Sequence, residues 1–118
     1  MNREDLRRRT KEFALKIIAL VASLPKNRAS DVVGYQLLKS GTSIGANYRE
    51  ACRARSRAEF ISKIGIVEQE ADETLYWLEL LAEMDLLAHN VLEPLQKECD
   101  ELLSIFVATG KSTKSPQP

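Results

Sequence analysis

Four segments of this chain carry apolar residues at helical spacing, and this pattern limits the possible folds more than any other feature. In each segment, apolar side chains return every three or four residues and so share one face of an α-helix. The four stripes are Leu6, Phe13, Ile17, Val21 and Leu24, with Thr10, Ala14 and Ile18 beside them; Val33, Leu37, Leu38, Ile44 and Ala51; Phe60, Ile64, Val67, Ala71, Thr74, Leu75, Leu78 and Leu81; and Leu92, Leu95, Cys99, Leu102, Leu103 and Phe106. The pattern predicts an all-α protein, an antiparallel up-down-up-down four-helix bundle.

Capping residues and prolines indicate where the first three helices begin and end. Pro25 should end a first helix that spans about 4–24, because the residue before a proline disfavours helical geometry. Ser30 or Asp31 can cap the second helix. Ser56 and Glu59 have the spacing of a capping box, which predicts a third helix from about 57 to about 84.

The fourth helix is expected from about Asn90 to Thr109, with Gly110 as its C-terminal cap. The segment 111–118 (KSTKSPQP) has no apolar side chain and is predicted to be a disordered tail behind a bundle of residues 1–110. The third helix is longer than a compact bundle needs. Tyr76 and Trp77 near its end should therefore be buried against another subunit.

Two glycines in the second helical segment need a reason, because each costs a helix about 1 kcal/mol relative to alanine. Gly41 and Gly45 are four residues apart and so lie on one helix face. Close approach of a neighbouring helix is one interpretation, and a ligand-binding backbone is the other.

Composition excludes several classes of protein. No apolar run approaches the roughly 18 residues of a membrane span, and no cleavage pattern follows the apolar residues 17–24. We therefore expect a cytoplasmic protein. Cys52 and Cys99 both lie in helical patterns and are expected to be reduced and structural.

A search for catalytic and cofactor motifs is negative, so no enzyme activity and no cofactor are expected. The only histidine, His89, lies in a predicted turn, where a solvated side chain is the simplest interpretation. One histidine and two distant cysteines do not predict a zinc site, and no Glu-x-x-His pair predicts a di-iron bundle. No phosphate-binding loop of the GxxxxGK[ST] type is present.

Charge is distributed unevenly although the net charge is zero. Residues 1–63 contain 14 Lys and Arg against 6 Asp and Glu, and residues 64–118 contain 3 against 11, so the two parts carry +8 and −8. Within the basic part, a dense cluster with Tyr48 beside it contains Arg49, Arg53, Arg55, Arg57 and Lys63. If the first helix packs nearby, the cluster would be extended by Arg3, Arg7, Arg8, Arg9 and Lys11.

Two interpretations of the basic cluster remain open. Arginine can bond phosphate with two N–H groups at once, so the cluster could bind RNA or DNA through the backbone. Alternatively, it could pair with the acidic segment 68–73 of another subunit. A +8 and a −8 surface would suit a head-to-tail ring in which Arg53, Arg55 or Arg57 faces the third helix of the next subunit.

The run from Ser40 to Leu81 closely resembles the four-helix-bundle proteins encoded in intervening sequences of bacterial 23S ribosomal RNA genes. The superfamily includes the accessory variability determinant of diversity-generating retroelements. The matching features are Ser40, Ser43, Ile44, Ala46, Asn47, Glu50, the Arg/Ser turn, Phe60, the E-A-D-E-T run at 70–74 and Trp77-Leu78. The resemblance covers about 8–106.

This resemblance implies a homopentameric barrel without known catalysis, and a possible role in binding nucleic acid. The retroelement members bind RNA and a reverse transcriptase through a markedly basic surface, whereas this chain has no net charge. Asn47 and Glu50 allow two interpretations: buried hydrogen-bonding groups that fix helix register, or residues that line a central channel.

Overall fold

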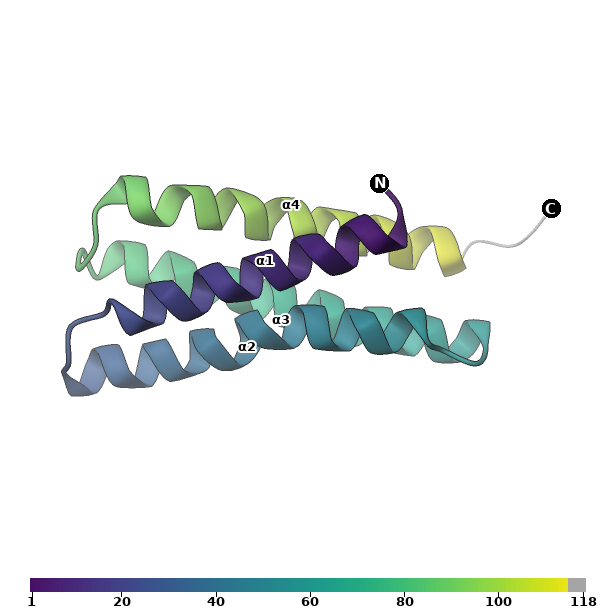
Figure 1. Ribbon diagram of the computed structural model, residues 1–118, viewed down its shortest axis with the longest axis horizontal. Helices are drawn as coiled ribbons and strands as arrows, with labels where there is room; N and C mark the ends of the chain where they lie inside the picture. Colours follow the sequence, from purple (N-terminus) through teal and green to yellow (C-terminus); the bar gives the residue numbers. More distant parts are fainter. Residues whose placement is uncertain (115–118) are drawn as a thin grey trace.

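The computed structural model describes residues 1–114, and these form four helices that run antiparallel in succession (Figure 1). The helices are α1 (Arg3–Ala22), α2 (Arg28–Cys52), α3 (Arg57–Glu83) and α4 (His89–Lys114). They form a rod of 53 × 21 × 20 Å. The described residues contain no strand, and the predicted all-α, up-down-up-down four-helix bundle is confirmed.

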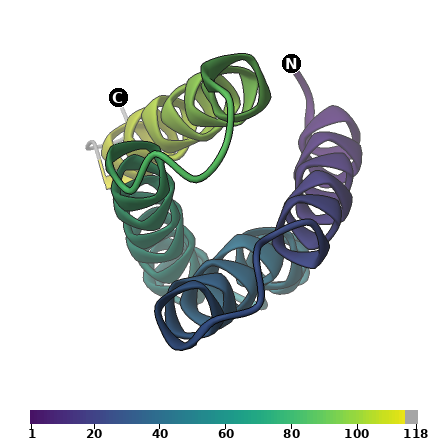
Figure 2. The same ribbon diagram turned by 90° about the vertical axis from the view of Figure 1, so that its left-hand side faces the viewer.

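The four sides of the bundle are not equally closed. The α1–α2, α2–α3 and α3–α4 pairs pack extensively, whereas α1 and α4 touch far less. Seen from its end, the bundle is most open between α1 and α4 (Figure 2). The core is therefore built mainly by consecutive helices, which matches the short connections between them.

The predicted apolar stripes supply most of the core. The fully enclosed side chains (under 2% exposed) include Phe13, Ile17, Leu37, Ile44, Ile64, Val67, Leu78, Leu81, Leu92, Leu102 and Phe106. The prediction that Ile18 lies beside the first buried stripe is wrong, because its side chain is 45% exposed. Leu20 is buried instead. Thr10 and Thr74 are buried, and their hydroxyls are hydrogen-bonded. Thr10 donates to the Leu6 carbonyl at 2.8 Å, and Thr74 donates to the Glu70 carbonyl at 2.7 Å.

The start of α2 differs from the sequence prediction. The cap is Asn27, whose side-chain oxygen accepts the backbone N–H of Ser30 at 2.9 Å, rather than Ser30 or Asp31. Asparagine is an equally good cap, so helix formation starts three residues earlier and Asp31 falls in the first turn.

The start of α3 agrees with the prediction. Ser56 is the cap, and its hydroxyl accepts the N–H of Glu59 at 3.1 Å. The Glu59 carboxylate accepts the N–H of Arg55 at 3.2 Å rather than that of Ser56. The reciprocal bond of the capping box is thus displaced by one residue.

The predicted end of α4 is wrong. The helix passes through Gly110, which is buried, and continues to Lys114. A Cβ on Gly110 would lie 3.6 Å from Ile64 and 3.4 Å from Glu68 of α3, which are ordinary contact distances, so packing does not require a glycine here. Residues 111–114 of the predicted disordered tail are helical, and 115–118 lie outside the described residues.

The glycines of α2 allow a close approach of α1. A Cβ on Gly41 would lie 3.0 Å from Cγ2 of Ile17, and a Cβ on Gly45 would lie 3.1 Å from Oγ1 of Thr10. The packing interpretation of this glycine pair is therefore confirmed. Larger side chains at these positions would force α1 and α2 apart.

Two polar residues of α2 do not join helices through buried hydrogen bonds. Asn47 donates to the carbonyl oxygen of Ser43 in its own helix at 2.9 Å. Glu50 is exposed and lies 3.5 Å from the Lys63 ammonium. The interpretation that they are buried groups fixing register is therefore wrong for Glu50, and the bond of Asn47 stays within α2.

The aromatic residues near the end of α3 are accessible in the single chain. Tyr76 is 55% exposed, and its ring packs edge-on against that of Trp77 with 5.0 Å between centroids. The Trp77 indole N–H donates to the Glu73 carboxylate at 3.3 Å. Burial of this pair by another subunit stays a prediction.

Candidate functional site

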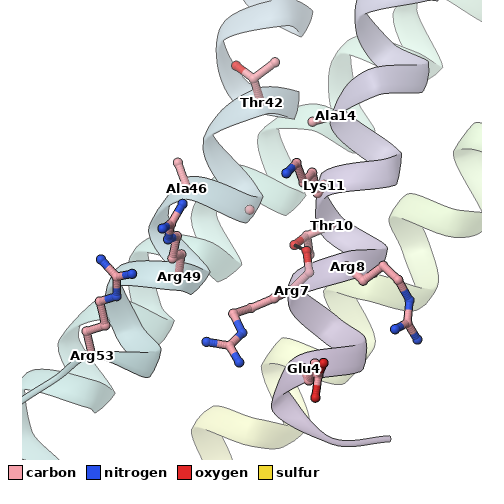
Figure 3. A pocket seen from close by; sticks show the side chains of 11 residues that line it. Glu4, Arg7, Arg8, Thr10, Lys11, Ala14, Thr42, Ala46, Arg49 and Arg53 are labelled. Carbon is pink, nitrogen blue, oxygen red and sulfur yellow. Dashed lines mark hydrogen bonds between the residues drawn. The ribbon is translucent and has the colours of Figure 1, made fainter.

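A basic groove of about 630 Å³ runs between α1 and α2 on the outside of the bundle. Its lining comprises Glu4, Arg7, Arg8, Thr10, Lys11, Ala14, Thr42, Gly45, Ala46, Arg49 and Arg53. Five of these eleven side chains are cationic and one is anionic. We call this feature the α1–α2 groove (Figure 3).

The cations form two rows that follow the two helices. Arg7 and Lys11 are four residues apart on α1, and Arg49 and Arg53 are four apart at the end of α2, so each pair shares one helix face. In Figure 3 the Arg7 side chain extends toward α2, whereas Arg8 points away from Arg49 and Arg53. Arg8 instead lies 2.9 Å from Asp5 on the surface of α1.

Small side chains complete the lining of the α1–α2 groove. They are Ala14, Thr42, Gly45 and Ala46, and Ala14 and Thr42 lie further along the helices than the cations (Figure 3). Gly45 belongs both to this lining and to the contact with Thr10. The same glycine therefore sets how closely the two cationic rows approach each other.

The groove cations carry charge that the chain itself does not neutralise. Within residues 1–114, Arg7, Lys11, Arg49 and Arg53 form no ion pair. Like charges four residues apart on a helix repel by about 0.2–0.5 kcal/mol per pair. An anion bound between the rows would relieve this repulsion, so the groove is suited to a phosphate-bearing ligand.

The structure divides the predicted basic cluster into separate places. Arg49 and Arg53 line the α1–α2 groove. Arg55 and Lys63 line a smaller depression of about 280 Å³ with Arg53 and two carboxylates, Glu50 and Glu59. The three cations there are partly offset by the two carboxylates, so this depression is a weaker anion site.

Arg57 has a structural contact. Its guanidinium donates through Nε (2.8 Å) and through Nη2 to the backbone oxygen of Thr113. This contact ties the start of α3 to the last described turn of α4. Arg57 as a phosphate contact stays a prediction.

The cations near the N-terminus of α1 also lie in different places. Arg7 and Lys11 join the groove as the extended patch predicted, whereas Arg3 lies over the Phe60 ring at 4.9 Å. Arg9 faces α4, where its hydrogen bonds to the Glu98 carboxylate raise the pKa of the guanidinium further above the ordinary range, against the lowering effect of burial.

Tyr48, His89 and Cys99, which the sequence analysis also discussed, do not line the α1–α2 groove. Tyr48 is 3% exposed, its ring lies 5.3 Å from that of Phe106, and burial raises its pKa well above the ordinary value. It cannot stack on a ligand. His89 is exposed and begins α4 instead of lying in the preceding turn. Cys99 is buried and contacts the Ala71 carbonyl at 3.3 Å.

Sequence reasoning allowed cations of the first helix to extend the cluster, but it did not predict two facing rows. The available signal was the antiparallel order of the first two helices, which brings the start of one beside the end of the other. With that pairing, Arg7 and Lys11 meet Arg49 and Arg53.

Metal and membrane sites were also sought. Within residues 1–114, no three or more His, Cys, Asp or Glu side chains are grouped to hold a metal ion. None of the helices in this part of the chain is long and apolar enough to span a bilayer.

Comparison with known proteins identifies a family and a solved structure of similar fold. The fold matches the crystal structure, at 1.70 Å resolution, of a protein with unknown function from the S23 ribosomal protein family of Bacteroides thetaiotaomicron VPI-5482. The TM-score is 0.86 at 38% identity, over 94% of this chain and 99% of that chain. A search of curated proteins finds no significant match. A sequence model described as 23S rRNA-intervening sequence protein matches residues 4–108. The chain belongs to the 23S rRNA-intervening sequence protein family.

Proposed function

We propose that this protein is a non-enzymatic, cytoplasmic accessory protein that binds structured RNA through the α1–α2 groove and works as a homo-oligomeric ring. The observation that carries the proposal is the convergence of Arg7, Lys11, Arg49 and Arg53 on one groove without an internal counter-ion among residues 1–114. RNA phosphates would supply the missing negative charge. The family description, which refers to an intervening sequence of 23S rRNA, supports RNA as the polyanion.

The ring part of the proposal rests on charge and exposed surface. α1 and α2 lie on one side of the bundle and α3 and α4 on the other (Figure 2). Exposed carboxylates of α3, such as Asp72, Glu79 and Glu83, form no ion pair within residues 1–114. A neighbour could place Arg53 or Arg55 against this acidic side, and the next neighbour would repeat the contact around a closed ring of five, as the family resemblance implies.

Fluorescence anisotropy of a labelled RNA hairpin, titrated with salt, tests the RNA proposal. We expect binding that weakens steeply with salt and is reduced at least tenfold by the double substitution Arg49→Gln with Arg53→Gln. The matched control is Lys26→Gln with Arg28→Gln, which removes two charges near the other end of α2. No binding at low salt, or equal loss in both variants, would count against the groove.

A second candidate function is a protein-interaction scaffold whose charges serve assembly alone. It is favoured by Asp72, Glu79 and Glu83 of α3, which form no ion pair among residues 1–114. Analytical ultracentrifugation of Glu79→Lys with Glu83→Lys, beside the Arg49 and Arg53 double variant, separates the two functions. If the Glu79→Lys with Glu83→Lys variant dissociates into monomers and the wild-type protein does not bind RNA, the scaffold function is correct.

A further inference from the structure

The spacing of the cations gives the α1–α2 groove two parallel walls of positive charge. Four residues of helix advance by about 6 Å, so Arg7 and Lys11 lie one turn apart on one wall, as do Arg49 and Arg53 on the other. The groove is thus an elongated channel rather than a point-like anion pocket. A chain of phosphates fits this shape better than a single phosphate does.

The lining has no aromatic side chain on which a base could stack. The nearest candidates by sequence are occupied elsewhere: Tyr48 is buried against Phe106, and Phe60 lies under Arg3. Proteins that bind single-stranded nucleic acid rely on aromatic stacking for much of their affinity. The groove therefore lacks what an unpaired strand requires.

The lining also lacks the amide side chains that read adenine. It contains no Asn or Gln, and its two hydroxyls are committed to the helix backbone, Thr10 to Leu6 at 2.8 Å and Thr42 to Leu38 at 2.7 Å. Bidentate amide contacts are the usual means of recognising adenine, and they are not available here. What remains is guanidinium and ammonium groups facing phosphate oxygens.

We infer that the ligand of the α1–α2 groove is the phosphate backbone of a double-stranded RNA stem, recognised by shape and charge and not by sequence. The inference rests on the proposed RNA binding and names the kind of RNA. In a stem the bases are already stacked on each other, so the protein needs to supply only the phosphate contacts.

The test compares three labelled RNAs by anisotropy at several salt concentrations: two hairpin stems of unrelated sequence and equal length, and an unstructured strand of the same length. We expect the two stems to bind with affinities within about threefold of each other, and the single strand to bind at least tenfold more weakly. Arg49→Gln with Arg53→Gln should reduce the slope of log K against log salt by about 1–2 for the stems.

The variants and outcomes separate this inference from the proposed function. Arg7→Gln with Lys11→Gln tests the opposite wall, so the test does not depend on one variant folding, and Lys26→Gln with Arg28→Gln is the control. Equal or tighter binding of the single strand would overturn the duplex inference and leave RNA binding intact. A strong preference between the two stems would overturn sequence-independent recognition. No binding of any RNA at low salt would overturn both proposals.

Discussion

The Arg9 guanidinium of α1 donates two hydrogen bonds of 2.7 Å to the Glu98 carboxylate of α4, from Nε to Oε2 and from Nη2 to Oε1. We call this bidentate contact the Arg9–Glu98 fork. The Arg9 side chain is only 18% exposed and that of Glu98 26% exposed. Glu101 adds a second carboxylate 2.9 Å from Arg9. Because α1 and α4 otherwise touch little, this fork is the main polar connection across the open side of the bundle.

Replacing Glu98 should therefore weaken the whole fold. Glu98→Gln removes the charge that pairs with a largely enclosed guanidinium, and we expect the free energy of unfolding to fall by about 1–2 kcal/mol. Urea denaturation measures this change. Glu101→Gln is the control, because Glu101 is 62% exposed and should matter by only a few tenths of a kcal/mol. Equal losses in the two variants would show that the fork has no special role.

The α1–α2 contact at Gly41 predicts a penalty for one added methyl group. In Gly41→Ala the new Cβ would lie 3.0 Å from Cγ2 of the buried, β-branched Ile17, which has no free space to move into. Overpacking should outweigh the gain in helix propensity and destabilise the protein by about 1 kcal/mol.

Gly65→Ala is the matched control for this methyl group. A Cβ at Gly65 meets nothing within 4 Å. Its substitution should stabilise α3 by about 0.5–1 kcal/mol. Thermal melts of both variants test the contrast, and a stabilising Gly41→Ala would show that the two helices can separate at little cost.

Cys99 predicts a loss of stability at alkaline pH. Burial raises the pKa of its thiol from 9.0 to about 12, so the unfolded chain loses this proton at lower pH than the folded protein does. Stability should therefore decline between pH 9 and pH 12, by at most about 1.4 kcal/mol per pH unit from this group. The difference between wild type and Cys99→Ala isolates this contribution, and parallel pH profiles would contradict it.

The contact of Arg57 with Thr113 predicts local fraying without global unfolding. Arg57→Ala leaves the Thr113 carbonyl without its guanidinium donor. Amide protons in the last turn of α4 should then exchange several-fold faster, while those at Leu92 and Leu95 keep their protection. Hydrogen exchange followed by NMR measures both regions, and unchanged exchange at the end of α4 would mean that Gly110 packing alone holds it.

Regular periodicity made the bundle predictable, because each stripe marks a helix and each short connection makes the next helix antiparallel. The end of α4 was not predictable from local rules. Gly110 looks like a helix cap in the sequence, yet the helix continues through it and buries it beside Ile64 of α3. The Asn27 cap was missed because Ser30 and Asp31 are also good caps, and local sequence does not rank them.

The candidate site was predictable only in part, for a related reason. Clustering in sequence placed Arg49 and Arg53 together because they share a helix face. It also grouped Arg57 with them, although Arg57 lies on the next helix, α3, and its guanidinium contacts the end of α4. Facing rows depend on which helices pair, and this information lies in the packing of Gly41 and Gly45 rather than in the charges themselves.

The separation of cationic α1 and α2 from the more acidic α3 and α4 gives a chain of zero net charge a permanent dipole across its short axis. In an electric field such a molecule experiences little net force but a torque. Near a polyanion it would rotate until the α1–α2 side faces inward before any contact forms. On a column it would be retained by both cation and anion exchangers at one pH, which a protein with evenly mixed charges would not be.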